Sequence, residues 1–239
     1  MLLPATFPLI ILAAGIGARM GAKQAKQYIE INGKTILEHT LDVFLSHSRI
    51  SQIVVVLHPK DDIFHKLPIA QHELITTIIG GDERVDSVLS GLKHLNQMSN
   101  KTNENQYVLV HDAARPCIDH TSISQLIEVC ENDVGGILAI PVADTIKQAK
   151  AENSLIDKTI NREKLWQAQT PQMFKLQDLY SAIISAQKKG LNITDEASAM
   201  EHSGASVRLV LGTSKNIKVT HPSDLSLATY YLADKEKTI

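Results

Sequence analysis

A glycine-rich turn followed by two cations is the segment of this sequence best suited to chemistry. The apolar run Leu9–Leu12 leads into a turn that contains Gly15 and Gly17, and the cations Arg19 and Lys26 follow. A buried strand that ends in such a turn presents backbone N–H groups to an anion, and the cations add positive charge beside them. The pattern favours a site for a nucleoside triphosphate, although an ordinary strand-to-helix turn with solvated cations has the same composition.

Two common phosphate-binding loops do not match this turn. A Walker A loop needs four residues between its glycines and a Gly-Lys-Ser/Thr end, and the segment has neither. The dinucleotide-binding fingerprint needs Gly or Ala three residues after its second glycine, where this chain has Met20. The turn therefore disfavours both a Walker-type NTPase and a nicotinamide dehydrogenase.

The rest of the chain predicts the framework that positions this turn. Strand-like and helix-like segments alternate, which predicts an α/β fold with a doubly wound, mostly parallel sheet. Several strands are nearly continuous apolar runs, as expected when helices cover both faces of a parallel sheet. The expected strands cover residues 9–12, 52–57, 74–79, 107–111, 136–140 and 205–211, and the expected helices cover residues 35–46, 84–98, 121–131, 176–189, 195–203 and 223–233.

Residues 141–171 break this alternation. Val142–Lys147 and Ser154–Ile160 alternate loosely between apolar and polar residues, which is typical of a hairpin. A hairpin that projects from a sheet is hard to stabilise alone, so this β-arm needs a partner. We therefore expect a single domain, residues 1–239, that forms a homodimer through the arm.

Candidate site residues follow the expected strands, because open α/β sheets bind ligands beyond the carboxyl ends of their strands. Gly81, Asp82 and Ser87 follow the third strand and are suited to approach a base or a ribose. After the fourth strand, the Asp112 carboxylate is suited to a Mg²⁺ ion bound with a triphosphate, and Arg115 to a second anion. Each group also has a structural interpretation: an N-capping loop for the first, and a buried Asp112–Arg115 ion pair for the second.

Two later segments each combine a cation with a compact polar environment. One contains Arg162 and is followed closely by Thr170, and the other contains Lys218 within the run Asn216–Thr220. Each is a weak signal alone.

The composition excludes several classes of function. Lys and Arg number 24 against 26 Asp and Glu, so the chain has no general basic field for nucleic acid or an anionic membrane. Two cysteines are too few for a disulfide framework or a zinc site. No segment offers the roughly 20 continuous apolar residues of a membrane span. We expect a cytoplasmic protein with reduced thiols.

Taken together, these motifs resemble those of the 2-C-methyl-D-erythritol 4-phosphate cytidylyltransferase family. They run in order from about residue 7 to residue 234, and the ordered set is far more specific than the glycine turn alone. The matching motifs include Ala-Ala-Gly-x-Gly-x-Arg-Met at 13–20, Lys-Gln-Tyr at 26–28, Gly-Gly-Asp-Glu-Arg at 80–84, Val-His-Asp-Ala-Ala-Arg-Pro at 110–116, Thr-Pro-Gln at 170–172, Thr-Asp-Glu-Ala-Ser at 194–198 and Asn-Ile-Lys-Val-Thr at 216–220.

The resemblance implies a Rossmann-like nucleotidyltransferase fold with CTP and a methylerythritol phosphate as substrates. The products would be a CDP-linked polyol and pyrophosphate, in the non-mevalonate route to isoprenoids. Mg²⁺ would accompany CTP, with Asp112 as its protein ligand. The implied catalytic residues are Arg19 and Lys26, which neutralise charge on the transferring phosphate, and Arg162 and Lys218, which hold the polyol phosphate. The implied CTP-binding residues are Ala13, Ala14, Gly15, Gly17, Gly81, Asp82 and Ser87, and Asp112, Arg115, Thr145 and Thr170 complete the polyol side.

Two alternatives stay open at this point. A ribitol 5-phosphate cytidylyltransferase would share the CTP half and differ in the polyol pocket around Arg115, Thr145 and Thr170. A non-catalytic nucleotide-binding module would keep the glycine turn but need not keep all four cations. The chain also departs from the family pattern at Ala25, where Pro is common, and at Lys215, where an acidic residue is common.

Loss of either loop cation provides the first test. Removal of one preorganised charge-stabilising donor typically lowers the rate by roughly 10²–10³. We expect Lys26→Ala and Arg19→Ala to lower turnover within that range while the circular dichroism spectrum stays that of the wild type. Turnover near the wild-type value in either variant would contradict the assignment.

Overall fold

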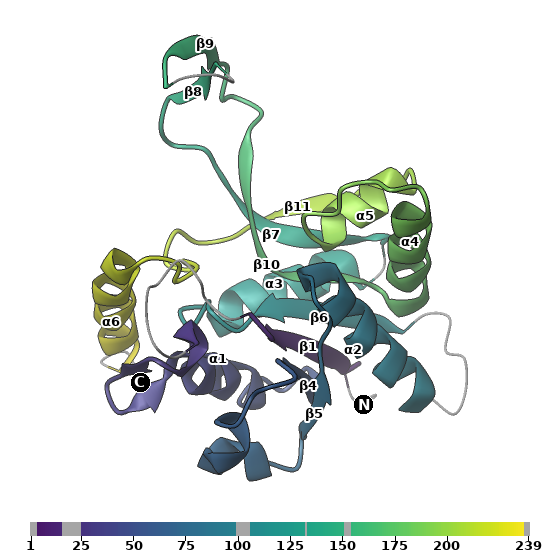
Figure 1. The fold of residues 1–239 in the computed structure, drawn as a ribbon, viewed down its shortest axis with the longest axis vertical. Coiled ribbons are helices and arrows are strands. Elements are labelled where there is room, and N and C mark those ends of the chain that lie inside the picture. The colour runs from purple at the N-terminus through teal and green to yellow at the C-terminus, as the bar shows by residue number, and fades with distance from the viewer. Residues whose placement is uncertain (1–3, 16–24, 99–105, 132, 151–153, 237–239) are drawn as a thin grey trace.

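The computed structural model describes residues 4–15, 25–98, 106–131, 133–150 and 154–236. Its strands include β1 (Phe7–Ala13), β4 (Ile50–Leu57), β5 (Ile75–Ile79), β6 (Tyr107–Asp112), β7 (Gly135–Pro141), β10 (Trp166–Lys175) and β11 (Arg208–Leu211). These form one sheet in the order β11-β7-β10-β6-β1-β4-β5, in which β10 runs antiparallel to both neighbours and the other pairs are parallel (Figure 1). The mostly parallel, doubly wound sheet predicted from the sequence is confirmed.

Helices cover both faces of this sheet. They are α1 (Ile36–Leu45), α2 (Arg84–Met98), α3 (His120–Cys130), α4 (Leu176–Lys188), α5 (Glu196–His202) and α6 (Pro222–Glu236). Leu9 and Ile11 of β1 pack with α1 and α3, whereas Ile10 packs with α2, α4 and α5. Because side chains alternate between the faces of a strand, this uniformly apolar run supplies both cores at once.

Local sequence explains where two of these helices lie. Thr35 and Glu38 form a capping box at the start of α1: the Thr35 hydroxyl accepts from the Glu38 N–H, and the Glu38 carboxylate accepts from the Thr35 N–H. Gly91 brings α2 close to β1, because a Cβ at this position would lie 2.8 Å from Cδ1 of Ile10. Close packing here sets the position of the amino end of α2, which lines the site described below.

The β-arm projects away from the sheet between β7 and β10 (Figure 1). Its strands β8 (Ile146–Ala149) and β9 (Ile156–Ile160) pair antiparallel, with Ile146 opposite Ile160, so the predicted hairpin is present. The sequence did not predict β10 as a sheet strand. Its first three residues are exposed and belong to the approach from the arm, and only its second half is buried between β6 and β7.

The remaining short elements are the strands β2 (Glu30–Ile31) and β3 (Lys34–Thr35) and the 3₁₀ turns η2 (Lys26–Tyr28), η3 (Phe64–Lys66) and η4 (Pro68–Gln71). Within the described ranges, no helix combines the length and apolar character needed to cross a membrane.

Candidate active site

A pocket of about 210 Å³ opens where β1 and β6 end and α2 begins. Open α/β sheets bind their ligands at this edge. The turn after β1, the start of α2, the end of β6 and the loop after β11 all contribute to it. The lining residues are Leu12, Ala14, Gly15, Lys26, Gln27, Gly81, Asp82, Glu83, Arg84, Ser87, Asp112, Ala113, Ala114 and Lys218.

The pocket brings together many residues that the sequence predicted to act together. Those that line it are Ala14, Gly15, Lys26, Gly81, Asp82, Ser87, Asp112 and Lys218. The other predicted residues lie elsewhere: Ala13, Arg115 and Thr170 are buried in or beside the strands, Thr145 and Arg162 are exposed on the arm, and Gly17 and Arg19 fall outside the described residues.

Hydrogen bonds hold the two edges of the turn region in place. The Gln27 amide donates to the carbonyl of Ala13 at 2.6 Å, which fixes η2 and its Lys26 beside the end of β1. On the opposite edge, the Gly81 N–H donates to the Ser87 hydroxyl at 3.3 Å. A Cβ at Gly80 would lie 2.5 Å from that hydroxyl and 2.9 Å from the Cβ of Ala14, so only glycine fits between these two loops.

Asp112 lies at the centre of a charge cluster at the end of β6. Its Oδ2 accepts from the Lys218 ammonium at 2.8 Å and lies 3.7 Å from Nε of Arg115, while its Oδ1 lies 3.4 Å from Nε of Arg84. Burial alone would raise the pKa of the Asp112 carboxyl, but the three cations outweigh burial and hold that pKa well below its usual range. Asp112 is therefore a carboxylate at every physiological pH, and the predicted ion pair with Arg115 is part of a larger cluster.

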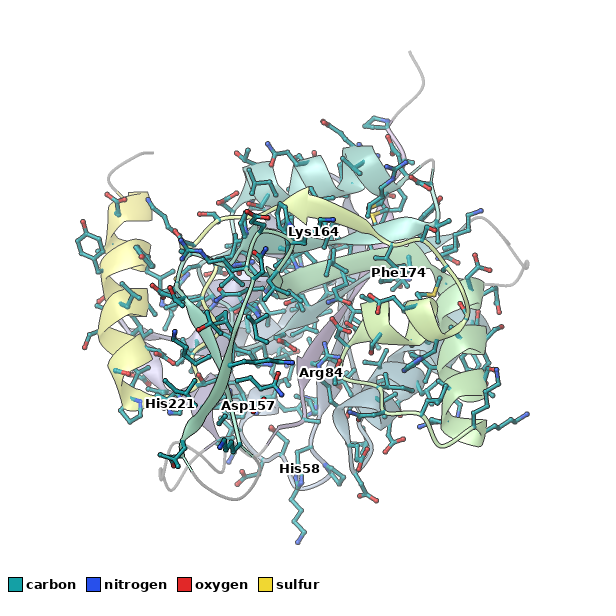
Figure 2. The ribbon with its side chains drawn as sticks, turned by 90° about the horizontal axis from the view of Figure 1, so that it is seen from above. His58, Arg84, Asp157, Lys164, Phe174 and His221 are labelled. Atoms are coloured by element: carbon teal, nitrogen blue, oxygen red, sulfur yellow. The ribbon has the colours of Figure 1, made fainter. Side chains whose placement is uncertain are left out.

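Arg84 connects this cluster to α5. Its guanidinium donates to both carboxylate oxygens of Glu196, at 2.6 and 3.1 Å, and its other edge faces Asp112. Glu196 is 1% exposed, and Arg84 is the cation that it pairs with. In Figure 2, which looks from above, Arg84 lies near the middle of the view and not at the rim. The guanidinium thus joins a buried carboxylate to the wall of the pocket.

Beneath the pocket, Thr170 and His111 fix the backbone that carries Asp112. The Thr170 hydroxyl accepts from the Asp112 N–H at 3.1 Å, and it lies 3.0 Å from Nδ1 of the fully buried His111. The Arg115 carbonyl lies 3.3 Å from Nε2 and can only accept, so Nε2 carries the ring proton and donates to it. In the neutral ring Nδ1 then has no proton and accepts from the Thr170 hydroxyl. A neutral histidine in one tautomer satisfies the whole chain of bonds.

Asn216 holds the loop that carries Lys218. Its side-chain amide donates to the backbone carbonyl of Thr170 at 2.8 Å, and its backbone carbonyl accepts from the Arg115 guanidinium at 2.7 Å. Val219, which follows Lys218, donates its backbone N–H to the carbonyl of Ala114 at 2.8 Å. These bonds fix the ammonium of Lys218 against β6.

The chain matches the family model described as IspD: 2-C-methyl-D-erythritol 4-phosphate cytidylyltransferase over residues 7–234. The chain belongs to this family. A 2-C-methyl-D-erythritol 4-phosphate cytidylyltransferase of Vibrio vulnificus (strain YJ016) is 52% identical over 225 residues, which cover 94% of this chain and 93% of that protein. Family membership makes the chain a nucleotidyltransferase enzyme and excludes the non-catalytic binding module.

Solved structures of this family share the fold. The crystal structure of a 4-diphosphocytidyl-2C-methyl-D-erythritol synthase superposes with a TM-score of 0.83 at 37% identity, covering 96% of this chain and all of that one. The Francisella tularensis 2-C-methyl-D-erythritol 4-phosphate cytidylyltransferase gives a TM-score of 0.80 at 34% identity, covering 95% of this chain and all of that one. The Rossmann-like architecture implied by the sequence resemblance is therefore confirmed.

Arg84 in the pocket wall and Glu196 behind it were not predicted from the sequence, although both lie in matching motifs. One signal could have found Arg84: it begins α2, where the helix macrodipole disfavours a cation. A cation in that position needs an anionic partner from elsewhere in the chain. Nothing in the local sequence identifies Glu196 as that partner.

The described residues offer Mg²⁺ a single carboxylate in the charge cluster. Within those residues, no three His, Cys, Asp or Glu side chains form a metal-binding group. Asp112 nevertheless fits one position of an Mg²⁺ shell, because this ion usually takes one or two carboxylates and completes its shell with phosphates and water. An ion brought in with a nucleotide is compatible with this donor set.

The buried His111 makes stability depend on pH. Burial lowers the pKa of His111 to about 3, and the nearby Asp112 only partly opposes that shift. Below about pH 6.5, the ordinary pKa of histidine, His111 binds a proton in the unfolded chain but stays neutral in the folded chain. The contribution of His111 to the free energy of unfolding is therefore fully present above pH 6.5 and is lost as the pH falls toward 3.

We expect urea unfolding to show that the wild type loses about 2 kcal/mol more free energy of unfolding than His111→Gln between pH 7 and pH 5. The exposed His72→Gln should behave as wild type, and equal pH dependence in all three would refute this account.

Proposed function

We propose that this pocket carries out the reaction of the family: CTP and 2-C-methyl-D-erythritol 4-phosphate give 4-diphosphocytidyl-2-C-methyl-D-erythritol and pyrophosphate. The convergence of Lys26 and Lys218 with the glycine turn on a single pocket is the observation that carries the proposal. Two cations that line one pocket suit a reaction between two phosphates.

The reaction needs charge control more than proton transfer. The phosphate of the polyol substrate is already an anion, so no general base is required to make it nucleophilic. The difficulty is to bring it to the α-phosphorus of CTP against charge repulsion. Positioning and electrostatic stabilisation therefore supply the catalysis, as in other phosphoryl transfers.

The CTP half is formed by small residues from two loops. Gly80 packs closely against Ala14 and Ser87, and this contact holds the two loops together at the edge of the pocket. In this assignment CTP is held by residues Ala13, Ala14, Gly15, Gly17, Gly81, Asp82 and Ser87. Lys26 and Arg19 then neutralise charge on the transferring phosphate and on the departing pyrophosphate.

Mg²⁺ bound with CTP would screen the charge of the triphosphate, with Asp112 as its protein ligand. Lys218 and Arg162 hold the polyol phosphate. Thr170 and Arg115 support this side from beneath, since Thr170 holds the Asp112 backbone and Arg115 holds the Lys218 loop.

Arg162 and Thr145 bear on the oligomeric state. Both are exposed on the arm, and the Arg162 guanidinium donates to the carbonyl of Ala143. The arm also exposes Leu155 and Ile156, which are 61% and 60% accessible. A homodimer in which the arm of one subunit reaches the pocket of the other would bury these side chains and bring Arg162 to a polyol phosphate. Cys117 and Cys130 are buried and form no disulfide, which suits a cytoplasmic protein.

A pyrophosphate-release assay tests the reaction. CTP and Mg²⁺ are offered with methylerythritol phosphate, with ribitol 5-phosphate, or with neither polyol. We expect release with methylerythritol phosphate and at most a small fraction of that rate with ribitol phosphate. Preference for ribitol phosphate would favour the sibling activity, and release with neither substrate would reject the proposal.

Mixed dimers test whether the site is shared between subunits. In a mixture of Arg162→Ala and Lys26→Ala subunits, half of the dimers are mixed, and each contains one site with both cations intact if the arm crosses over. We expect recovery of about one quarter of the wild-type activity, although each variant alone is nearly inactive. Failure to recover on mass-verified mixed dimers would mean that each site is built from one subunit.

A further inference from the structure

Lys218 has two roles that oppose one another: it pairs with Asp112, and under the proposed function, on which this inference rests, it binds a phosphate. Its ammonium donates to Oδ2 of Asp112 at 2.8 Å, yet its proposed task is to attract the phosphate of the polyol. An ammonium paired with a carboxylate presents little net charge to an approaching anion. The charge of Lys218 is available to substrate only to the extent that other groups neutralise Asp112.

Two guanidinium groups are placed for that task. Arg84 faces Oδ1 of Asp112, the oxygen that Lys218 does not use, through Nε and Nη2, both at 3.4 Å. Arg115 has its Nε 3.7 Å from Oδ2, and that buried Nε–H has no hydrogen-bond partner among the described residues. A donor without a partner costs free energy in a buried position, so it is ready to take up the oxygen that Lys218 leaves.

We propose that Arg84, held by Glu196, and Arg115 are positioning residues that act as counter-ions of Asp112 and thereby leave the charge of Lys218 for the polyol phosphate. Asp112 is 7% exposed, so water compensates its charge poorly, and in the free protein the two guanidinium groups carry the part that Lys218 does not. Mg²⁺ bound with CTP would add to that compensation without replacing it. Glu196 keeps Arg84 from collapsing onto Asp112, because its two hydrogen bonds at 2.6 and 3.1 Å are shorter than the 3.4 Å contacts to Asp112.

The contact between Arg84 and Asp112 can be removed without a change in the net charge of the cluster. Arg84→Gln alone would leave Glu196 buried without its cation and endanger folding. The double variant Arg84→Gln/Glu196→Gln removes one charge of each sign and leaves two amides that can bond to each other. Glu196→Gln alone keeps Arg84 beside Asp112, and Glu201→Gln on the exposed side of α5 is the control for the helix itself.

Steady-state kinetics give the first readout. For the double variant we expect KM for methylerythritol phosphate to rise at least tenfold while KM for CTP changes less than about twofold. Glu196→Gln should stay within about threefold of wild type in both constants, and Glu201→Gln should match wild type. A double variant with an unchanged KM for the polyol phosphate, or a Glu196→Gln variant that loses as much, would overturn the proposal.

Chemical labelling of Lys218 gives a readout that does not depend on turnover. Reductive methylation of the free protein, followed by peptide mass spectrometry, reports how firmly each ammonium is held. We expect Lys218 to react at least threefold more slowly in the double variant than in Glu196→Gln, while Lys215, which pairs with Asp234, reacts equally in both. Equal methylation rates of Lys218 in the two variants would refute the counter-ion role. This readout needs no turnover, so it stays decisive even if the wild type releases no pyrophosphate and the proposed function is wrong.

A single substitution keeps the test available if the double variant does not fold. Arg84→Lys retains a positive charge beside Glu196 but cannot fork to two carboxylates. We expect an intermediate rise in KM for the polyol phosphate, about threefold, with melting temperature near that of wild type. No rise in a well-folded Arg84→Lys protein would count against the proposal.

Discussion

The buried carboxylate of Asp112 is the constraint on which the rest of the site depends. A nearly inaccessible negative charge at the end of a strand must be neutralised, and cations from three separate parts of the chain converge on it. Each of those cations needs its own support: Glu196 for Arg84, the Asn216 carbonyl for Arg115, and the fixed loop for Lys218. The need to compensate the charge of Asp112 thus determines where the charged side chains of the pocket wall lie.

The layer beneath Asp112 serves the same constraint with neutral groups. Hydrogen bonds of Thr170 and His111 link the end of β6 to the loop that follows it. A charged histidine there would compete with the cations above. A fully buried, neutral ring avoids that competition and gives the Asp112 backbone a fixed direction.

Much of this arrangement could be predicted from the sequence, because the edge of an α/β sheet gathers residues that follow its strands. Asp112, Asp82 and the glycine turn were found in this way, and the ordered motifs added Lys218. The Arg84–Glu196 pair was not found, since 112 positions separate the two residues and only the fold, in which α4 packs against both α2 and α5, brings them together. Strand β10 was missed for a related reason: its first three residues are exposed and follow the polar pattern of the arm, and the burial of the rest comes from pairing with β6 and β7.

The continuity of β10 has a mechanical consequence. This strand begins where the arm leaves the sheet and ends beside β6, and Thr170, which holds the Asp112 backbone, lies between those two points. A tilt of the arm would therefore be passed along the backbone to the segment that carries Thr170, and through the Thr170 hydroxyl to the Asp112 peptide. A contact made far out on the arm would in this way bear on the end of β6.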